Sequence, residues 1–128
     1  MKILGIDYGR SKVGLAISEG FLSEPLKVIR YKNPKVLSEQ IKRIIEQEKV
    51  GKVVVGVSEG KMAEESKKFA LDISLLSSAI VETFDETLTS HDAQALSMEA
   101  GIHRKKRHEM EDAYAAAIML QNYLDNVA

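Results

Sequence analysis

Three acidic positions carry residue types that could bind a divalent metal ion. Asp7 ends an apolar run that begins at Ile3, the pair Asp85-Glu86 ends another apolar run, and Asp112 lies in an acidic stretch near the C-terminus. Three carboxylates brought together repel one another, and Mg²⁺ or Mn²⁺, which prefer oxygen ligands, can relieve that repulsion. Such ions can activate a water molecule for phosphodiester cleavage, so these acids are candidates for that chemistry.

Each of these acids also has an ordinary structural explanation. Asp7 could bond to the backbone amides of the turn that follows it, and Asp112 could be a first-turn acid favoured by the helix dipole. Taken singly, the structural explanation is the better one for both. The metal-site hypothesis therefore depends on a fold that brings the acids together. Because neighbouring residues of a strand point to opposite faces, only one of Asp85 and Glu86 should face such a site.

The hydrophobic pattern predicts the elements that would position the acids. Apolar runs predict strands over 2–8, 13–18, 26–31, 52–57 and 80–84, and helical spacing predicts helices over 34–48, 62–76, from 89 or 90 to 101, and 109–125. Asn33-Pro34 is typical of a helix start, and Val50-Gly51 should end that helix. The hairpin followed by β-α-β crossovers predicts an α/β fold with a mixed sheet and helices on its faces. The unbroken apolar run KVVVGV, residues 52–57, predicts a central strand covered on both sides.

The composition narrows the class of protein. A chain of 128 residues suits a single domain over residues 1–128, and the absence of cysteine excludes disulfides and thiolate metal sites. No apolar run approaches the roughly 18 residues of a membrane span, and the N-terminus lacks the arrangement of a signal peptide. We therefore expect a cytoplasmic protein without membrane contact.

Bulk charge does not indicate a nucleic-acid-binding protein, because the formal net charge is −1. Local clusters could still bind phosphates. The basic stretch HRKKRH, residues 103–108, precedes Asp112, and Arg10 and Lys12 follow Asp7. A solvated loop and routine turn residues are the ordinary explanations. The alternative is a cationic rim for a phosphate backbone, formed by Arg10, Lys12, Arg104, Lys105, Lys106 and Arg107.

Four segments together resemble one known family. They are GIDYGRSKVGLAIS (5–18), VVVGVSEG (53–60), FDETLTSHDAQ (84–94) and EDAYAAAIMLQNYLD (111–125). In order and spacing they are similar to the YqgF family, also called RuvX, whose members are described as pre-16S rRNA nucleases and are related to RuvC-type Holliday junction resolvases. The first segment alone would be weak, because actin-like ATPases and sugar kinases begin similarly. All four together are a strong signal, and the resemblance extends in order and spacing over nearly the whole chain.

The resemblance implies an RNase H-like domain with a five-stranded mixed sheet of order 3-2-1-4-5 and helices on both faces. It also implies that Asp7, Glu86 and Asp112 are the catalytic residues and hold one or two Mg²⁺ (or Mn²⁺) ions, and that Thr89 lies in a turn that contacts nucleic acid. The implied function is a metal-dependent endonuclease, a phosphodiester hydrolase that processes the 5′ end of pre-16S ribosomal RNA in ribosome biogenesis.

Two alternatives remain open within this resemblance. One is a Holliday junction resolvase-type DNA nuclease, and the other is a non-catalytic RNA-binding assembly factor. The net charge near zero, and Thr87 where the family usually has Arg, favour the second slightly. Aromatic residues, at 5% of the chain, form no obvious stacking platform that would indicate RNA or DNA. Resolving a junction of two strands would favour a homodimer, whereas trimming one strand would suit a monomer, so a monomer or weak homodimer is expected.

An actin-like phosphotransferase is disfavoured. That architecture needs two such domains with a nucleotide between them, and 128 residues supply one. The chain also lacks the glycine-rich phosphate-binding loop Gly-x-x-x-x-Gly-Lys-Ser/Thr.

Overall fold

A five-stranded mixed sheet forms the centre of the computed structural model, which describes residues 1–85 and 109–127. The strands are β1 (Lys2–Tyr8), β2 (Lys12–Ser18), β3 (Ser23–Arg30), β4 (Val50–Val57) and β5 (Ile80–Asp85). The first three form an antiparallel meander, and β4 and β5 run parallel to β1. The strand order is β3-β2-β1-β4-β5, which confirms the predicted order.

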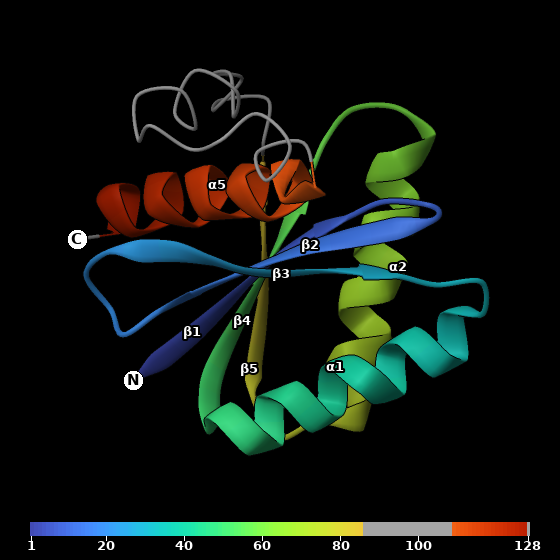
Figure 1. Ribbon diagram of the computed structural model, residues 1–128, viewed down its shortest axis with the longest axis horizontal. Coiled ribbons are helices and arrows are strands. Elements are labelled where there is room, and N and C mark those ends of the chain that lie inside the picture. Colours follow the sequence, from blue (N-terminus) through green and yellow to red (C-terminus); the bar gives the residue numbers. More distant parts are fainter. Residues whose placement is uncertain (86–108, 128) are drawn as a thin grey trace.

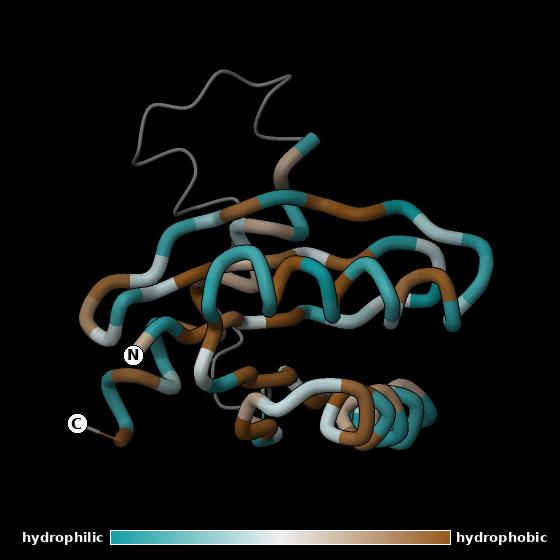
Figure 2. Tube along the Cα trace, turned by 90° about the horizontal axis from the view of Figure 1, so that it is seen from below, coloured by the Kyte–Doolittle hydropathy of each residue, from teal (hydrophilic) through white to brown (hydrophobic). Residues whose placement is uncertain are grey.

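Helices cover both faces of this sheet, as predicted (Figure 1). The helices α1 (Pro34–Glu48) and α2 (Lys61–Leu76) pack on one face, and α5 (Glu111–Val127) packs on the other. Along the helices, hydrophobic and hydrophilic residues recur in turn (Figure 2), as is typical of helices that pack one side on a sheet. In the part of the chain that the structure describes, no helix is long and apolar enough to cross a membrane.

The strand β4 has the central position that its apolar run predicted. Val53 and Val55 belong to the core under α1 and α2, whereas Val54 belongs to the core under α5. All three side chains are fully buried. Successive β4 residues therefore serve two different cores, which explains why the run contains no polar alternation.

The first helix has the predicted bounds, Pro34–Glu48. The Asn33 side chain accepts a hydrogen bond from the Lys35 amide at 2.8 Å, and Pro34 occupies the first turn. The helix stops before Val50-Gly51, the pair expected to break it, and these two residues already belong to β4. Lys49, in the left-handed conformation with φ 57°, ends the helix. One residue of this conformation is enough to reverse the chain direction.

The starts of other elements differ from the predicted ones by a few residues. The strand β3 begins at Ser23, three residues before the predicted start, because Ser23 pairs with Ser18 across the hairpin. Pro25 is compatible with this strand, since β3 lies at the edge of the sheet. The last helix begins at Glu111 and not at residue 109. The helix predicted from residue 89 or 90 to 101 lies outside the described residues.

Candidate active site

Asp7 lies between two glycines in the sheet. It pairs with Gly14 on β2 and with Gly56 on β4. Directly paired residues project to the same face of a sheet, and the residues directly opposite Asp7 on both neighbouring strands are glycines. This face is the one that α5 covers, because Gly5, two residues earlier on β1, would place an added β-carbon 2.9 Å from the Leu120 β-carbon.

The N-terminal turn of α5 closes directly onto Gly14. A β-carbon added to Gly14 would overlap the carbonyl oxygen of Asp112. Only glycine allows the two backbones to approach this closely. Since Asp7 is the cross-strand partner of Gly14, the structure brings Asp7 and Asp112, two of the three predicted acids, to the same end of the sheet.

Lys12 forms an ion pair inside this acidic site. Its Nζ atom lies 3.0 Å from Oδ2 of Asp112, and the two side chains are 42% and 32% exposed. Lys12 precedes Gly14 by two residues on β2 and therefore projects to the same face. The sequence predicted Lys12 as a contact for nucleic acid, but it did not predict this pairing with Asp112.

Asp85 lies on the opposite face of the sheet from Asp7. Its neighbour Phe84 packs edge-to-face on Tyr123 of α5, with ring centroids 5.7 Å apart. Because strand residues alternate, Asp85 projects toward the α2 side. This placement agrees with the expectation that only one of Asp85 and Glu86 faces the site.

The remaining predicted site residues lie outside the described part of the chain. They are Glu86, Thr89, Arg104, Lys105, Lys106 and Arg107. Within residues 1–85 and 109–127, no group of three or more histidines, cysteines or acids is arranged to hold a metal ion. The prediction of a three-carboxylate centre therefore remains a prediction.

The donor chemistry of the two described acids fits a hard divalent cation. Asp7 and Asp112 both offer carboxylate oxygens, the ligand type that Mg²⁺ and Mn²⁺ prefer. The glycines on both sides of Asp7 add no side chain between the carboxylate and an approaching ion or phosphate. A third protein ligand would have to come from beyond the described residues.

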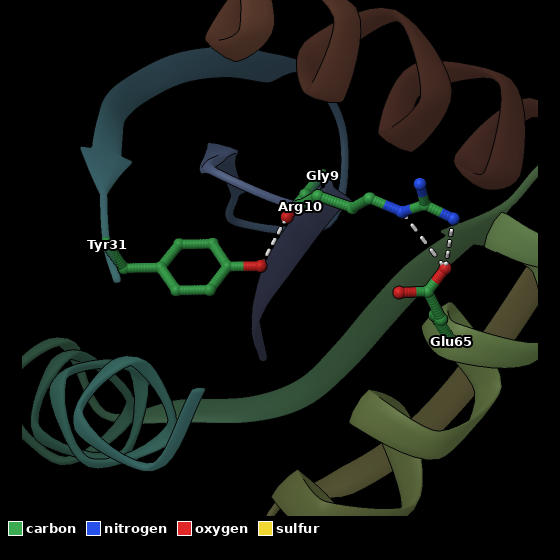
Figure 3. A network of polar contacts seen from close by, with 4 residues as sticks. All are labelled: Gly9, Arg10, Tyr31 and Glu65. Atoms are coloured by element: carbon green, nitrogen blue, oxygen red, sulfur yellow. Dashed lines mark hydrogen bonds and ion pairs between the residues drawn. The ribbon is translucent and has the colours of Figure 1, made fainter. Parts of the chain in front are cut away.

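Tyr31 fastens the turn that follows Asp7. Its hydroxyl donates a hydrogen bond to the Gly9 carbonyl at 2.5 Å (Figure 3), and its backbone amide donates one to the Ser11 carbonyl at 3.0 Å. Burial, with smaller contributions from nearby Tyr8 and Glu65, raises the pKa of Tyr31 well above its ordinary value. The phenol therefore stays protonated and remains a donor at neutral pH. Sequence reasoning missed this residue, because nothing in the pattern marks a tyrosine after β3 as a turn contact.

Two further contacts tie this part of the chain to α2. The Tyr8 ring stacks on Phe69, with centroids 4.5 Å apart. Arg10 donates from Nη2 at 3.0 Å and from Nε at 3.3 Å to the same Glu65 oxygen, as Figure 3 shows. Arg10 was predicted to contact nucleic acid, and its side chain is still 65% exposed in this pair. It therefore remains accessible from solvent at the end of the sheet that carries Asp7.

The comparison with known protein families identifies the chain. Residues 1–126 match the family described as "RuvX: Holliday junction resolvase". A relative from Pelotomaculum thermopropionicum is 36% identical, with 98% of this chain and 88% of the relative covered. A relative from Oceanobacillus iheyensis is 33% identical, with 98% of both chains covered. Both bear the name "Putative pre-16S rRNA nuclease".

Solved structures share the fold at low sequence identity. RuvC from T. thermophilus, solved in complex with a Holliday junction substrate, superposes with a TM-score of 0.66 at 15% identity, covering 98% of this chain and 96% of that one. The Holliday junction resolvase of fowlpox virus superposes with a TM-score of 0.65 at 14% identity, covering 98% and 99%. The resemblance inferred from the four sequence segments is thus confirmed: the chain belongs to the RuvX family and has the RNase H-like fold of RuvC-type resolvases.

Proposed function

We propose that this protein is a metal-dependent endonuclease whose substrate is the 5′ region of the 16S ribosomal RNA precursor. Membership of a nuclease family makes phosphodiester hydrolysis the class of reaction. The choice of substrate is supported by the shared name of the curated relatives, which are 33–36% identical over nearly the whole chain. We further propose that it acts in the cytoplasm as a monomer or weak homodimer.

The observation that carries this proposal is the convergence of Asp7 and Asp112 on Gly14. Asp7 is the direct partner of Gly14 in the sheet, and the Asp112 backbone abuts the same glycine. The backbone positions of two acids from opposite ends of the sequence are thereby set by contacts with one glycine. Catalytic groups need such fixed placement, because small displacements lower the rate strongly.

The roles proposed for the chain follow from this placement. Asp7 and Asp112 would hold the metal ion, with Glu86 as a third ligand. The proposal of Glu86 as the third ligand rests on the family resemblance of the segment FDETLTSHDAQ. A bound Mg²⁺ or Mn²⁺ ion supplies activation of a water molecule and stabilisation of the leaving oxygen. The carboxylates orient the scissile phosphate by fixing where that ion can bind.

The substrate backbone would be held by cations and one hydroxyl at the rim of the site. Arg10 and Lys12 are the described members of the predicted set. The Arg10 guanidinium is exposed beside Glu65, whereas the Lys12 ammonium pairs with Asp112. Thr89 and the basic residues Arg104, Lys105, Lys106 and Arg107 complete the proposal. Neutralising these four basic residues together should weaken binding of every nucleic acid similarly and make it less dependent on salt.

A second candidate substrate is four-way junction DNA. The description of the matching family and the RuvC fold favour it. The deciding experiment offers the purified protein two labelled substrates, a pre-16S RNA fragment with its 5′ extension and a four-way DNA junction, each with Mg²⁺ or with a chelator. We expect Mg²⁺-dependent cleavage of the RNA near the mature 5′ end. Preferential cleavage of the junction would support the second candidate, and binding of RNA without cleavage of either would indicate a non-catalytic assembly factor.

A further inference from the structure

We infer that Lys12 is a built-in cation of the acidic site, which takes the place of a second divalent ion, so that one divalent ion per chain completes the site. This inference rests on the proposed function. It assigns to Lys12 a role toward Asp112 that differs from a contact with the nucleic-acid backbone.

The Asp112 backbone packs directly on Gly14. Its carbonyl oxygen lies 1.9 Å, and the Ala113 backbone nitrogen 2.9 Å, from the position that a β-carbon on Gly14 would occupy. The helix start therefore cannot shift toward β2. Lys12 lies on the same strand and face as Gly14, and its ammonium meets the carboxylate of Asp112 at 3.0 Å. The approach of α5 to β2 thus sets up the ion pair.

The ion pair is poorly placed to stabilise the fold. Both side chains are more than 30% exposed, and exposed ion pairs contribute little to stability in water. The effect of Lys12 is local: its ammonium neutralises the carboxylate of Asp112, and Asp7 supplies a second carboxylate to the same site. A lysine at this position therefore reduces the repulsion between the two acids in the protein without metal.

The same ammonium opposes a second divalent ion at Asp112. Two like unit charges about 4 Å apart in water repel each other by about 1 kcal/mol, which weakens binding roughly fivefold. The repulsion between the Lys12 ammonium and a divalent ion is larger, because the ion carries two charges. Salt and solvent screening reduce this effect. Removing the charge of Lys12 should accordingly raise the affinity of the site for a divalent ion by about three- to tenfold.

The chain offers a matched control for this substitution. Lys2 pairs with Glu48 at 3.1 Å, and the two side chains are 31% and 41% exposed. The pair resembles the Lys12 pair in distance and exposure, but Lys2 begins β1 whereas Asp7 lies near its other end. Lys2→Gln therefore changes the net charge equally without changing the charge at the site.

The test is a titration of the full chain with Mn²⁺, without nucleic acid, with free Mn²⁺ followed by electron paramagnetic resonance. We expect one ion per chain in the parent, three- to tenfold tighter binding in Lys12→Gln, and parental binding in Lys2→Gln. A purely structural role for Lys12 predicts the opposite sign, since a disordered site binds metal more weakly. Circular dichroism and thermal unfolding check that all variants are folded.

Two ions per parent chain, or unchanged or weaker binding in Lys12→Gln, would overturn the inference. The variant Asp7→Asn separates this failure from a failure of the proposed function. If Asp7→Asn loses the ion while Lys12→Gln binds like the parent, only the inference is wrong. If Asp7→Asn binds Mn²⁺ as the parent does, or if the parent binds none, both are wrong.

Discussion

The carbonyl oxygen of Asp112 occupies the space that a β-carbon on Gly14 would need. An alanine at residue 14 must therefore push the start of α5 away from β2. We expect Gly14→Ala to lower the free energy of unfolding by about 1–3 kcal/mol, as other overpacking substitutions do, and to abolish nuclease activity. Urea denaturation measures the first effect and an RNA cleavage assay measures the second.

Gly51→Ala is the matched control for that substitution. Its added β-carbon would meet the Met1 side chain at 2.7 Å, but Met1 is 74% exposed and can move aside. This variant should keep nearly parental stability and activity. Equal losses in the two variants would show that the contact between Gly14 and Asp112 has no special importance.

Tyr31 should matter for activity more than for stability. Tyr31→Phe removes the hydrogen bond to the Gly9 carbonyl and keeps the ring near Tyr8. We expect a loss of about 0.5–1.5 kcal/mol in unfolding free energy and a clear fall in cleavage rate, because the turn after Asp7 loosens.

Tyr123→Phe is the control for the Tyr31 variant. The Tyr123 hydroxyl donates to Glu82 at 2.5 Å, on α5 and away from the β1–β2 turn. A similar loss of stability with parental cleavage is expected. If both variants cleave RNA equally well, the turn contact does not position Asp7.

The raised pKa of Tyr31 predicts how stability depends on alkaline pH. The folded protein keeps this phenol protonated above pH 10.0, its ordinary value, whereas the unfolded chain releases the proton there. The stabilisation is therefore complete below pH 10.0 and is lost as the pH rises toward the folded-state value. Unfolding free energies measured in urea at increasing pH should fall less steeply in Tyr31→Phe than in the parent. Identical slopes would contradict the assigned environment.

Arg10 should contribute to nucleic-acid binding and little to folding. Its ion pair with Glu65 is exposed, so Arg10→Gln should change the unfolding free energy by less than about 1 kcal/mol. Binding of RNA should weaken, and the salt slope should decrease by about one. Glu65→Gln releases Arg10 and should strengthen binding. Weaker binding in both variants would instead indicate that the ion pair itself shapes the surface.

Much of the fold could be predicted because its signals are local. The apolar run of β4 predicted a central strand, and Asn33-Pro34 predicted the start of α1, and both are confirmed. The end of α1 at Glu48 was also predicted, but the left-handed conformation of Lys49 that follows it was not, since lysine seldom adopts that conformation. The start of β3 at Ser23 was not predicted, because it depends on the pairing of Ser23 with Ser18 of the neighbouring strand.

The site was only partly predictable for a different reason. Asp7 and Asp112 stood out as acids near the ends of predicted elements. The contacts that join them depend on how α5 docks on β2. Gly14 and Asp112 are far apart in the sequence, so no local pattern encodes their contact. Gly14 looked like an ordinary strand glycine and Lys12 like a turn cation. Their roles follow only from the distance between the two backbones.

The most direct test of the proposed nuclease site compares Asp7→Asn with Asp85→Asn in one cleavage assay. The two acids lie near the ends of β1 and β5, which run parallel with β4 between them, but Asp7 faces α5 and Asp85 faces the α2 side. With the pre-16S RNA fragment and Mg²⁺, we expect Asp7→Asn to lose cleavage by at least about 100-fold, a typical effect of removing a catalytic group, and Asp85→Asn to retain it. Parental cleavage by Asp7→Asn, in a protein shown to be folded, would contradict the proposal.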